Sequence, residues 1–421
     1  MLPKIDYSNE KELSQLITSQ KAYLHSLLKN DISNTYNDLL QSIKEKTKIL
    51  QKQKQTNTCI PSINMSDILQ GNVDNGLIAD FEQKGAVIIR NVIDKEEISS
   101  LYEDFKKYLI DNDYNNQKVS AEDNYFGELK SKKPQIFDIF WSQCQVQIRQ
   151  NANLALAKQF LNNSWAKHTQ DKDYFDFTKE CIYSDRIRKR EPKDNTLGLS
   201  PHIDGGSVER WLDSGYVKTY QSIFESNWRE HNPYDASFHK EIELTPAPAV
   251  CTAFRTFQGW IALTEQGEND GTLQVIPMLK EATAYLLLRP FLADIEKDIL
   301  CGAQMSRAQN ISGEFHKPLL DALVSIPVLY PGDTIWWHCD LVHAVENEHQ
   351  GANESSVTYI GSAPLCKKNT DFLQLQKEAF LCGKSSPDFA PMNREENYIN
   401  RASLEELSTL GKKQMGFLPW E

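Results

Sequence analysis

Apolar residues near the start of the chain recur at three- and four-residue spacings. They do so between residue 9 and about residue 30, and again between residues 36 and 50. Such a spacing places apolar side chains along one face of a helix. The pattern therefore predicts two amphipathic helices in an N-terminal helical extension of residues 1–56. We expect these helices to pack onto the rest of the protein, and a dimerisation arm is the alternative.

The segment that begins at residue 81 changes from a short strand-like pattern to a longer helical pattern. Its sequence from residue 81 is FEQKGAVIIRNVIDKEEISSLYEDFKKYL, in which a short apolar run is followed by a turn and a longer periodic stretch. Asp94 precedes the periodic stretch and Glu97 lies three residues later, which is the spacing of a capping box. A strand followed by a helix is expected here.

Between about residues 180 and 365 the chain consists of short β-rich runs separated by Gly, Pro, Asn and Asp. These runs are YSDRIRKR, FRTFQGWIALTE, GTLQVIPM, LVSIPVLYPGDTIWWH and SSVTYIGSAP. Many short strands of this kind are typical of a double-sheet jelly roll. One insertion, residues 280–300, has a helical pattern, and helical patterns return after Pro364. The fold class expected is a mainly β core with flanking helices, in one domain of residues 57–421 whose C-terminal helices buttress the sheet.

The composition of the chain indicates which kinds of binding partner and which cellular location to expect. The chain has 58 Asp and Glu against 46 Lys and Arg, a net charge of -12, which argues against nucleic acid and anionic membrane surfaces. No apolar run approaches the length of a membrane span, and the first residues lack the pattern of a signal peptide. Eight cysteines are spread singly, as reduced thiols would be. A cytoplasmic protein acting on a small molecule is expected.

Candidate chemistry begins in the segment LGLSPHIDGGSVERW. His202 and Asp204 are two residues apart, so on a strand both side chains leave the same face and could share one metal ion. The spacing alone is a weak signal. Pro201 before the pair and the glycines 205 and 206 after it strengthen the signal, because they favour a stiff entry and a tight exit.

A third ligand is expected from PGDTIWWHCDLVHAVE. There His343 follows a Gly-Asp turn and an aromatic strand. Two imidazoles and one carboxylate form a facial triad that suits Fe(II) better than zinc, which prefers a more closed site. His338 competes for the third position because His338 and Asp340 repeat the His-x-Asp spacing, but His343 leads into an alternating strand and is preferred.

Four blocks in this order carry a family resemblance. They are EQKGAVIIRNVIDKEEI, PHIDGG, WIALTEQGENDGTLQVIPM and GDTIWWHCDLVH. Together they resemble the phytanoyl-CoA dioxygenase-like superfamily, and FRTFQGW with PHIDGGSVERW resembles its YbiU-like branch. The resemblance implies a cupin-like double-stranded β-helix, Fe(II) and 2-oxoglutarate as cofactors, and hydroxylation of a small molecule that the sequence does not identify.

The sequence departs from the wider family where a co-substrate clamp is expected. An arginine usually follows the distal histidine, but Asn353 and Ser355 stand there. Arg255, in an otherwise apolar strand, is the first substitute for binding the far carboxylate of 2-oxoglutarate, and Arg188 is the second. Ordinary ion pairs are the alternative for both arginines.

Four further residues are candidates for contacts to the co-substrate or the substrate. Ser356 and Thr358 are candidates for hydroxyl contacts to the co-substrate, and Arg210 and Trp211, just beyond the glycine pair, are candidate substrate contacts at a pocket rim. Two other functions stay open. One is a metal-binding jelly roll without 2-oxoglutarate turnover, and the other is a different cupin-like metalloenzyme. The oligomeric state is also open.

Overall fold

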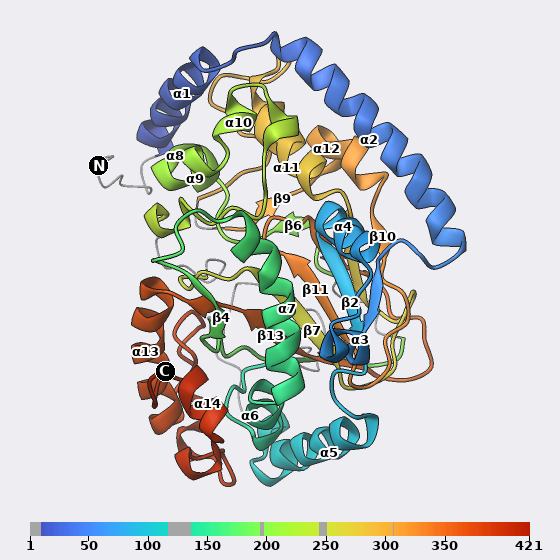
Figure 1. Ribbon diagram of the computed structural model, residues 1–421, viewed down its shortest axis with the longest axis vertical. Coiled ribbons are helices and arrows are strands. Elements are labelled where there is room, and N and C mark those ends of the chain that lie inside the picture. The colour runs from blue at the N-terminus through green and yellow to red at the C-terminus, as the bar shows by residue number, and fades with distance from the viewer. Residues whose placement is uncertain (1–9, 117–135, 194–197, 244–250, 306) are drawn as a thin grey trace.

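The computed structural model describes residues 10–116, 136–193, 198–243, 251–305 and 307–421. Strands occupy the middle of the molecule and helices surround them (Figure 1). The strands are β1 (Ser62–Asn64), β2 (Ala86–Arg90), β3 (Ile136–Phe137), β4 (Asp176–Glu180), β5 (Ile187–Arg190), β6 (His202–Ile203), β7 (Phe257–Ala262), β8 (Leu273–Val275), β9 (Gln309–Asn310), β10 (Val324–Ser325), β11 (Thr334–His338), β12 (His343–Val345), β13 (Ser355–Ser362) and β14 (Pro364–Leu365).

Helices of very different lengths connect these strands. The α-helices are α1 (Glu10–Ser26), α2 (Ile32–Gln55), α3 (Met65–Gln70), α4 (Asn75–Lys84), α5 (Lys95–Asp111), α6 (Gln143–Arg149), α7 (Ala152–His168), α8 (Glu209–Leu212), α9 (Ser214–Thr219), α10 (Gln221–Phe224), α11 (Leu279–Leu288), α12 (Gly313–Leu320), α13 (Lys367–Cys382) and α14 (Thr409–Gln414). The fold is therefore a mixture of helices and several sheets.

Two sheets form the centre. One has the strand order β1-β2-β11-β7-β13-β5-β3 and the other β10-β8-β12-β6-β9, while β14 and β4 form a separate pair. All described pairings are antiparallel except that of β1 with β2. The strands β7 and β11 are buried along their whole length. Continuous burial explains why these two strands are apolar runs rather than alternating ones, since both of their faces are covered.

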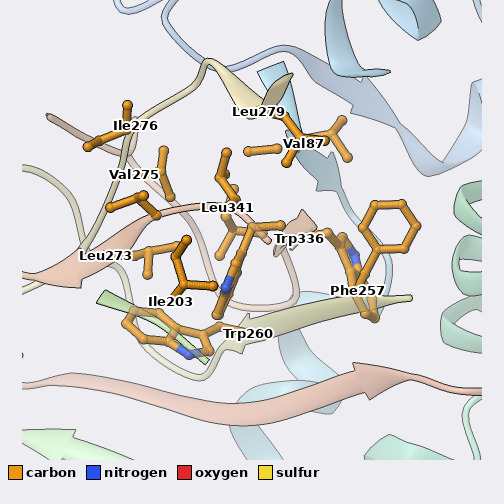
Figure 2. Packing of buried hydrophobic residues seen from close by; sticks show 14 of the residues in the cluster. Val87, Ile203, Phe257, Trp260, Leu273, Val275, Ile276, Leu279, Trp336 and Leu341 are labelled. Carbon is orange, nitrogen blue, oxygen red and sulfur yellow. The ribbon is translucent and has the colours of Figure 1, made fainter. Parts of the chain in front are cut away.

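The two sheets meet through their side chains. Trp337 of β11 contacts His343 of β12, with ring centroids 5.3 Å apart. Trp337 also contacts Trp260 of β7, which contacts Tyr359 of β13. Figure 2 shows part of the same core, with Trp260 from one sheet and Leu273 from the other. The inner face of the seven-stranded sheet is thus the face that carries these three aromatic residues.

Helix α7 covers the outer face of that sheet. Trp165 of α7 stacks on His338 at 4.9 Å and meets Phe257 edge to face. In Figure 1 this helix crosses in front of β7 and β13. His338 therefore points away from the second sheet.

The predicted elements of the N-terminal part are confirmed. Both amphipathic helices form, as α1 and α2, and pack onto the body through buried Leu24 and Leu39. The strand β2 is followed by α5, and the Asp94 carboxylate accepts from the backbone N–H groups of Glu96 and Glu97. The division of the chain into two parts at residue 56 stays a prediction. Helices α1 and α2 share one hydrophobic cluster with the sheets.

The helical insertion at residues 280–300 is shorter than expected. Its helix, α11, ends at Leu288, and Pro290 follows within a single 3-10 turn. Proline has no backbone N–H to continue the helical hydrogen bonds. In the C-terminal part, α13 and α14 form where helical patterns predicted them, and buried Glu395 accepts from the backbone N–H of Phe140 at 2.6 Å.

Candidate metal centre

Two strands of the five-stranded sheet bring two histidines face to face. His202 begins β6 and His343 begins β12, and the two residues are direct partners in the antiparallel pairing. Their ring centroids are 4.3 Å apart. Asp204 follows β6 directly, and the chain then turns sharply through Gly205 and Gly206, whose φ values are 82° and 93°. Glycine adopts such values without steric cost, so the tight exit predicted from the glycine pair is confirmed.

The ligand atoms of these three residues converge. The Nε2 atoms of His202 and His343 each lie 3.6 Å from a different carboxylate oxygen of Asp204. The three ligand atoms all lie within 4.8 Å of one another. On the far side of each ring, Nδ1 is 2.6 Å from the Ser200 carbonyl oxygen and 3.1 Å from the Leu341 carbonyl oxygen, respectively. Because a carbonyl only accepts, each Nδ1 carries the proton and each Nε2 offers its lone pair toward Asp204.

The protonation states suit a cation. Burial, together with the charge of His343, lowers the pKa of His202 to about 4, so this imidazole is neutral at pH 7. Burial acts to raise the pKa of Asp204, but the two imidazoles, which are protonated at the low pH where this carboxyl titrates, and Arg255 outweigh it and hold that pKa below its usual range. The Oδ1 atom of Asp204 is buried and has no hydrogen-bond partner among the described residues. A divalent metal ion would satisfy this orphaned oxygen, so the donor set fits such an ion.

Arg210 forms hydrogen bonds with the backbone on both sides of Gly205, next to Asp204. Its guanidinium donates to the carbonyl oxygens of Asp204 at 2.8 Å and Gly206 at 3.3 Å. It also forms an ion pair with Asp340 at 2.7 Å and donates to the Tyr220 hydroxyl. Asp340 lies three residues before the third ligand. The ion pair therefore ties the segment that carries the carboxylate to the segment that carries the second histidine.

The structure does not place Arg210 and Trp211 at a pocket rim, where the sequence predicted them. Only 4% of Arg210 is exposed, and its hydrogen bonds go to protein atoms. Trp211 is buried too, and its indole N–H donates to the Leu287 carbonyl at 3.2 Å. Both residues follow the glycine turn into the short helix α8, whose four residues are all buried. The sequence shows that both residues closely follow the glycine pair, but it does not show that the helix they form is buried in the interior.

The competing ligand His338 does not join the cluster. Its Nε2 lies 3.0 Å from the Pro233 carbonyl oxygen, on the outer face of the sheet. The preference for His343 agrees with this placement.

Arg255 lies close to the triad but outside it. Its guanidinium carbon is 4.8 Å from the centre of the Tyr183 ring, and its charge acts on Asp204. The Cys339 thiol donates to the Arg255 carbonyl at 3.0 Å. A Cβ built at Gly361 would lie 3.3 Å from Cδ of Arg255, so the side chain crosses β13 at a glycine.

Arg188 lies deeper between the sheets. It is 4% exposed, its Nη2 donates to the Gly271 carbonyl at 3.1 Å, and its guanidinium lies 5.5 Å from the Trp260 ring centre. Arg188 pairs with Val357 across β5 and β13. Its side chain therefore emerges on the inner face of the sheet, together with Tyr359.

The hydroxyl groups of Ser356 and Thr358 lie on the opposite face of β13 from Tyr359. Ser356 bonds with the Tyr102 hydroxyl of α5 at 2.7 Å, and Thr358 donates to the Arg186 carbonyl at 3.3 Å. The period of two along a strand puts residues 356 and 358 on the outer face when 359 faces inward. The structure does not bring these two hydroxyls to the triad.

Sequence reasoning missed several residues around the centre. Tyr216 donates to the Gly205 carbonyl and stacks on Tyr220, and Asp340 anchors Arg210. The one available signal was the four-residue spacing of the two tyrosines shortly after the glycine pair. In the sequence, Asp340 stands out only as part of a second His-x-Asp spacing.

Comparison with known proteins gives a consistent set of relatives. A family model described as Gig2-like matches residues 11–417. A protein of Escherichia coli K12 described as "Uncharacterized protein YbiU" is 34% identical over 389 residues, which cover 92% of each chain. This relative confirms the resemblance to the YbiU-like group. The wider placement in the phytanoyl-CoA dioxygenase-like superfamily stays a prediction.

Solved structures agree over nearly the whole chain. A Salmonella typhimurium LT2 protein described as a "Putative Oxidoreductase" has a TM-score of 0.90 and 33% identity, covering 96% of this chain and 97% of that one. The Candida albicans protein described as "GlcNAc Inducible Gene 2, GIG2 (DUF1479)" has a TM-score of 0.81 and 26% identity, covering 100% of this chain and 91% of that one. In the part of the chain that the structure describes, every helix is too short or too polar to span a bilayer.

Proposed function

The chain belongs to the Gig2-like family, and from this premise and the geometry of its His-Asp-His cluster we propose that it is an Fe(II)/2-oxoglutarate-dependent dioxygenase that hydroxylates a small molecule. The observation that carries the proposal is the triad of His202, Asp204 and His343. A relative described as a "Putative Oxidoreductase" supports the coarser class of an oxidoreductase. Two histidines and one carboxylate on rigid strands leave the open coordination positions that such oxygenases need.

The order of the strands supports a jelly roll of the double-stranded β-helix type. Four neighbours in one sheet are β5, β13, β7 and β11, and four in the other are β6, β12, β8 and β10. Strands that follow one another in the chain thus alternate between the two sheets in several places, as they do when a sheet is wound into two Greek keys. The two histidines of the triad begin β6 and β12 of the five-stranded sheet, and Asp204 directly follows β6.

Iron with 2-oxoglutarate would supply the oxidation, in which one atom of dioxygen enters a substrate C–H bond as hydroxyl and the other enters succinate as carbon dioxide leaves. The protein's contribution is positional. The Ser200 and Leu341 carbonyls fix both imidazole tautomers, and Arg210 fixes the backbone of the carboxylate ligand. Trp337 packs against His343 and Trp260 packs against Trp337, so apolar rings cover this side of the imidazole.

In this proposal Arg188 binds the distal carboxylate of 2-oxoglutarate. It is the more deeply buried of the two arginines predicted from the sequence, and its side chain emerges on the inner face of the sheet. A planar guanidinium matches a carboxylate with two parallel hydrogen bonds. We further propose a cytoplasmic protein acting on a small molecule, in keeping with its net charge of -12.

The first test adds Fe(II) and then 2-oxoglutarate to the metal-free protein without oxygen. We expect a saturable visible charge-transfer band, because the keto acid would chelate iron through two oxygens. His343→Ala should lose the band, whereas a matched control at an exposed histidine, His25→Ala, should keep it.

The alternatives make different predictions in the same experiment. Tight iron binding without any band would instead indicate a metal-binding protein without 2-oxoglutarate turnover, or another cupin-like enzyme. A band of full strength in His343→Ala would remove His343 from the ligand set.

A further inference from the structure

Arg255 is a cation without a matching anion. Among the described residues, its guanidinium forms no ion pair within 4 Å, and it lies against the face of the Tyr183 ring. It is only partly exposed, so water does not fully replace such a partner. A guanidinium that loses water without gaining an anion costs free energy, and its charge is permanent.

The groups nearest to Arg255 do not balance its charge. Burial raises the pKa of the Cys251 thiol and that of the Cys339 thiol to about 12, so both are neutral at pH 7. Burial also holds the pKa of Tyr183 well above its ordinary value. Two carboxylates act in this region: Asp204 also serves the metal centre, and Asp388 accepts from the backbone N–H and the hydroxyl of Thr252 at 2.9 and 2.6 Å. The local chemistry therefore leaves room for an anion from outside the protein.

The register of the sheet places the backbones of the two arginines on opposite sides of the row that contains Trp337. Trp337, which contacts His343, is paired with Gln258 on β7. Arg188 lies on the row of Ala262, because both pair with Val357, and four residues separate this row from that of Gln258 (262 minus 258). At strand rise this is about 14 Å of backbone. Arg255 lies three residues from Gln258 in the other direction (258 minus 255), before β7 begins.

The contacts of Arg255 hold it at the triad's end of the sheet. Cys339, whose thiol donates to the Arg255 carbonyl, lies in the loop that joins β11 to the strand of His343. The side chain then crosses β13 at Gly361, in the same row as Gln258 and Trp337. One small dicarboxylate chelated at the triad has a single free carboxylate, which cannot occupy both arginines.

We propose that Arg255 is a substrate-binding residue, and that the substrate is an organic anion whose carboxylate or phosphate group pairs with this guanidinium beside the metal centre. The inference rests on the proposed function in assigning 2-oxoglutarate to Arg188. It adds the substrate class, which neither the sequence nor the relatives give.

The test measures anion binding rather than turnover. Protein loaded with Mn²⁺ is titrated calorimetrically, with and without 2-oxoglutarate, using acetate, benzoate and phosphate, and using acetamide and benzamide as neutral counterparts of the two carboxylates. We expect at least one anion to bind at least ten-fold more tightly than its neutral counterpart or, for phosphate, to bind saturably. Arg255→Gln should weaken the affinity for this anion at least ten-fold and leave the affinity for 2-oxoglutarate unchanged.

Matched variants separate the roles. Arg188→Gln should weaken 2-oxoglutarate binding and spare the anion, and Arg255→Lys should retain part of the anion affinity because it keeps the charge. Arg229→Gln, at an exposed arginine paired with Asp38, should change neither. Phosphate binding without carboxylate binding would assign a phosphate ester as the substrate class.

Two results would overturn the inference. One is a parent protein that binds no anion of this set. The other is an Arg255→Gln variant that loses 2-oxoglutarate while Arg188→Gln keeps it, since Arg255 would then be the co-substrate clamp. Failure of the parent to bind 2-oxoglutarate at all, with anion binding at Arg255 intact, would instead count against the oxygenase and leave the anion site standing.

Discussion

The carboxylate of Asp204 depends on a residue that does not touch the metal position. Arg210 holds the carbonyl oxygens on both sides of Gly205, and Tyr216 holds the carbonyl of Gly205 itself. Three successive peptide groups after β6 are thus fixed by buried side chains. Mutation of partners that orient metal ligands in this way typically weakens metal affinity.

Arg210→Lys should therefore weaken metal binding about 10- to 100-fold without abolishing the fold. Lysine keeps the charge for Asp340 but cannot reach the Asp204 and Gly206 carbonyls at the same time. Calorimetric titration with Mn²⁺ measures the change. The matched control is Arg90→Lys, because Arg90 also forms an ion pair, with Asp333 at 2.7 Å, and donates to the Val328 carbonyl, but lies outside the triad. Equal metal affinity in both variants would make Arg210 a purely structural residue.

At the scale of elements, α11 is a layer between α2 and the strands. Tyr36 of α2 meets Tyr285 of α11 at 5.2 Å, and Lys46 pairs with Glu281 at 2.8 Å. On its other side, Leu279 approaches Gly85, where an added Cβ would lie 2.9 Å from the leucine Cβ. Burial on both sides explains why the middle of α11 is a continuous apolar run rather than an amphipathic stripe.

This arrangement predicts that α2 unfolds together with the body. Leu39→Ala, at a position with no exposure, should lower the free energy of unfolding by about 2–5 kcal/mol in a single denaturant transition. Ile49→Ala on the same helix, where 54% of the side chain is exposed, should change it by less than about 0.5 kcal/mol. A separate early transition in the Leu39 variant would show that residues 1–56 form an independent unit.

At the scale of the whole molecule, buried histidines make stability depend on pH. Burial lowers the pKa values of His202, His231 and His316 from 6.5 to about 4. Each of them is neutral when folded but takes up a proton below pH 6.5 when unfolded. The unfolded state then binds more protons, so stability is present above pH 6.5 and is lost as the pH falls toward 4.

His316 allows this effect to be measured away from the metal centre. Its Nδ1 accepts from the Ser312 N–H at 3.1 Å, a bond that the side-chain oxygen of glutamine can also accept. The free energy of unfolding of His316→Gln, relative to the parent, should therefore rise as the pH falls from 7 to 4, by at most about 3 kcal/mol. Denaturant unfolding at several pH values gives this difference. A difference independent of pH would show that His316 has the same pKa in the folded and the unfolded protein.

The sequence by itself determined the local features of this protein. Periodicity gave α1, α2 and the strand before α5, because side chains on one face of a helix or strand are set by spacing alone. The His202–Asp204 pair and its glycine exit were equally local. The resemblance to the YbiU-like group was also visible in the sequence, since it rests on the two short segments FRTFQGW and PHIDGGSVERW.

The tertiary structure decided what depends on residues far apart in the chain. Whether His338 or His343 completes the cluster followed from the face of the sheet that each occupies, with His338 stacked on Trp165 and His343 paired with His202. The outward direction of Ser356 and Thr358 was decided in the same way, because the register between strands selects which alternate residues face inward. Arg210 was predicted at a rim and lies in the interior, where Asp340 gives it a partner 130 residues away. Spacing along a chain fixes faces, but only the packing of one face against another determines which residues meet.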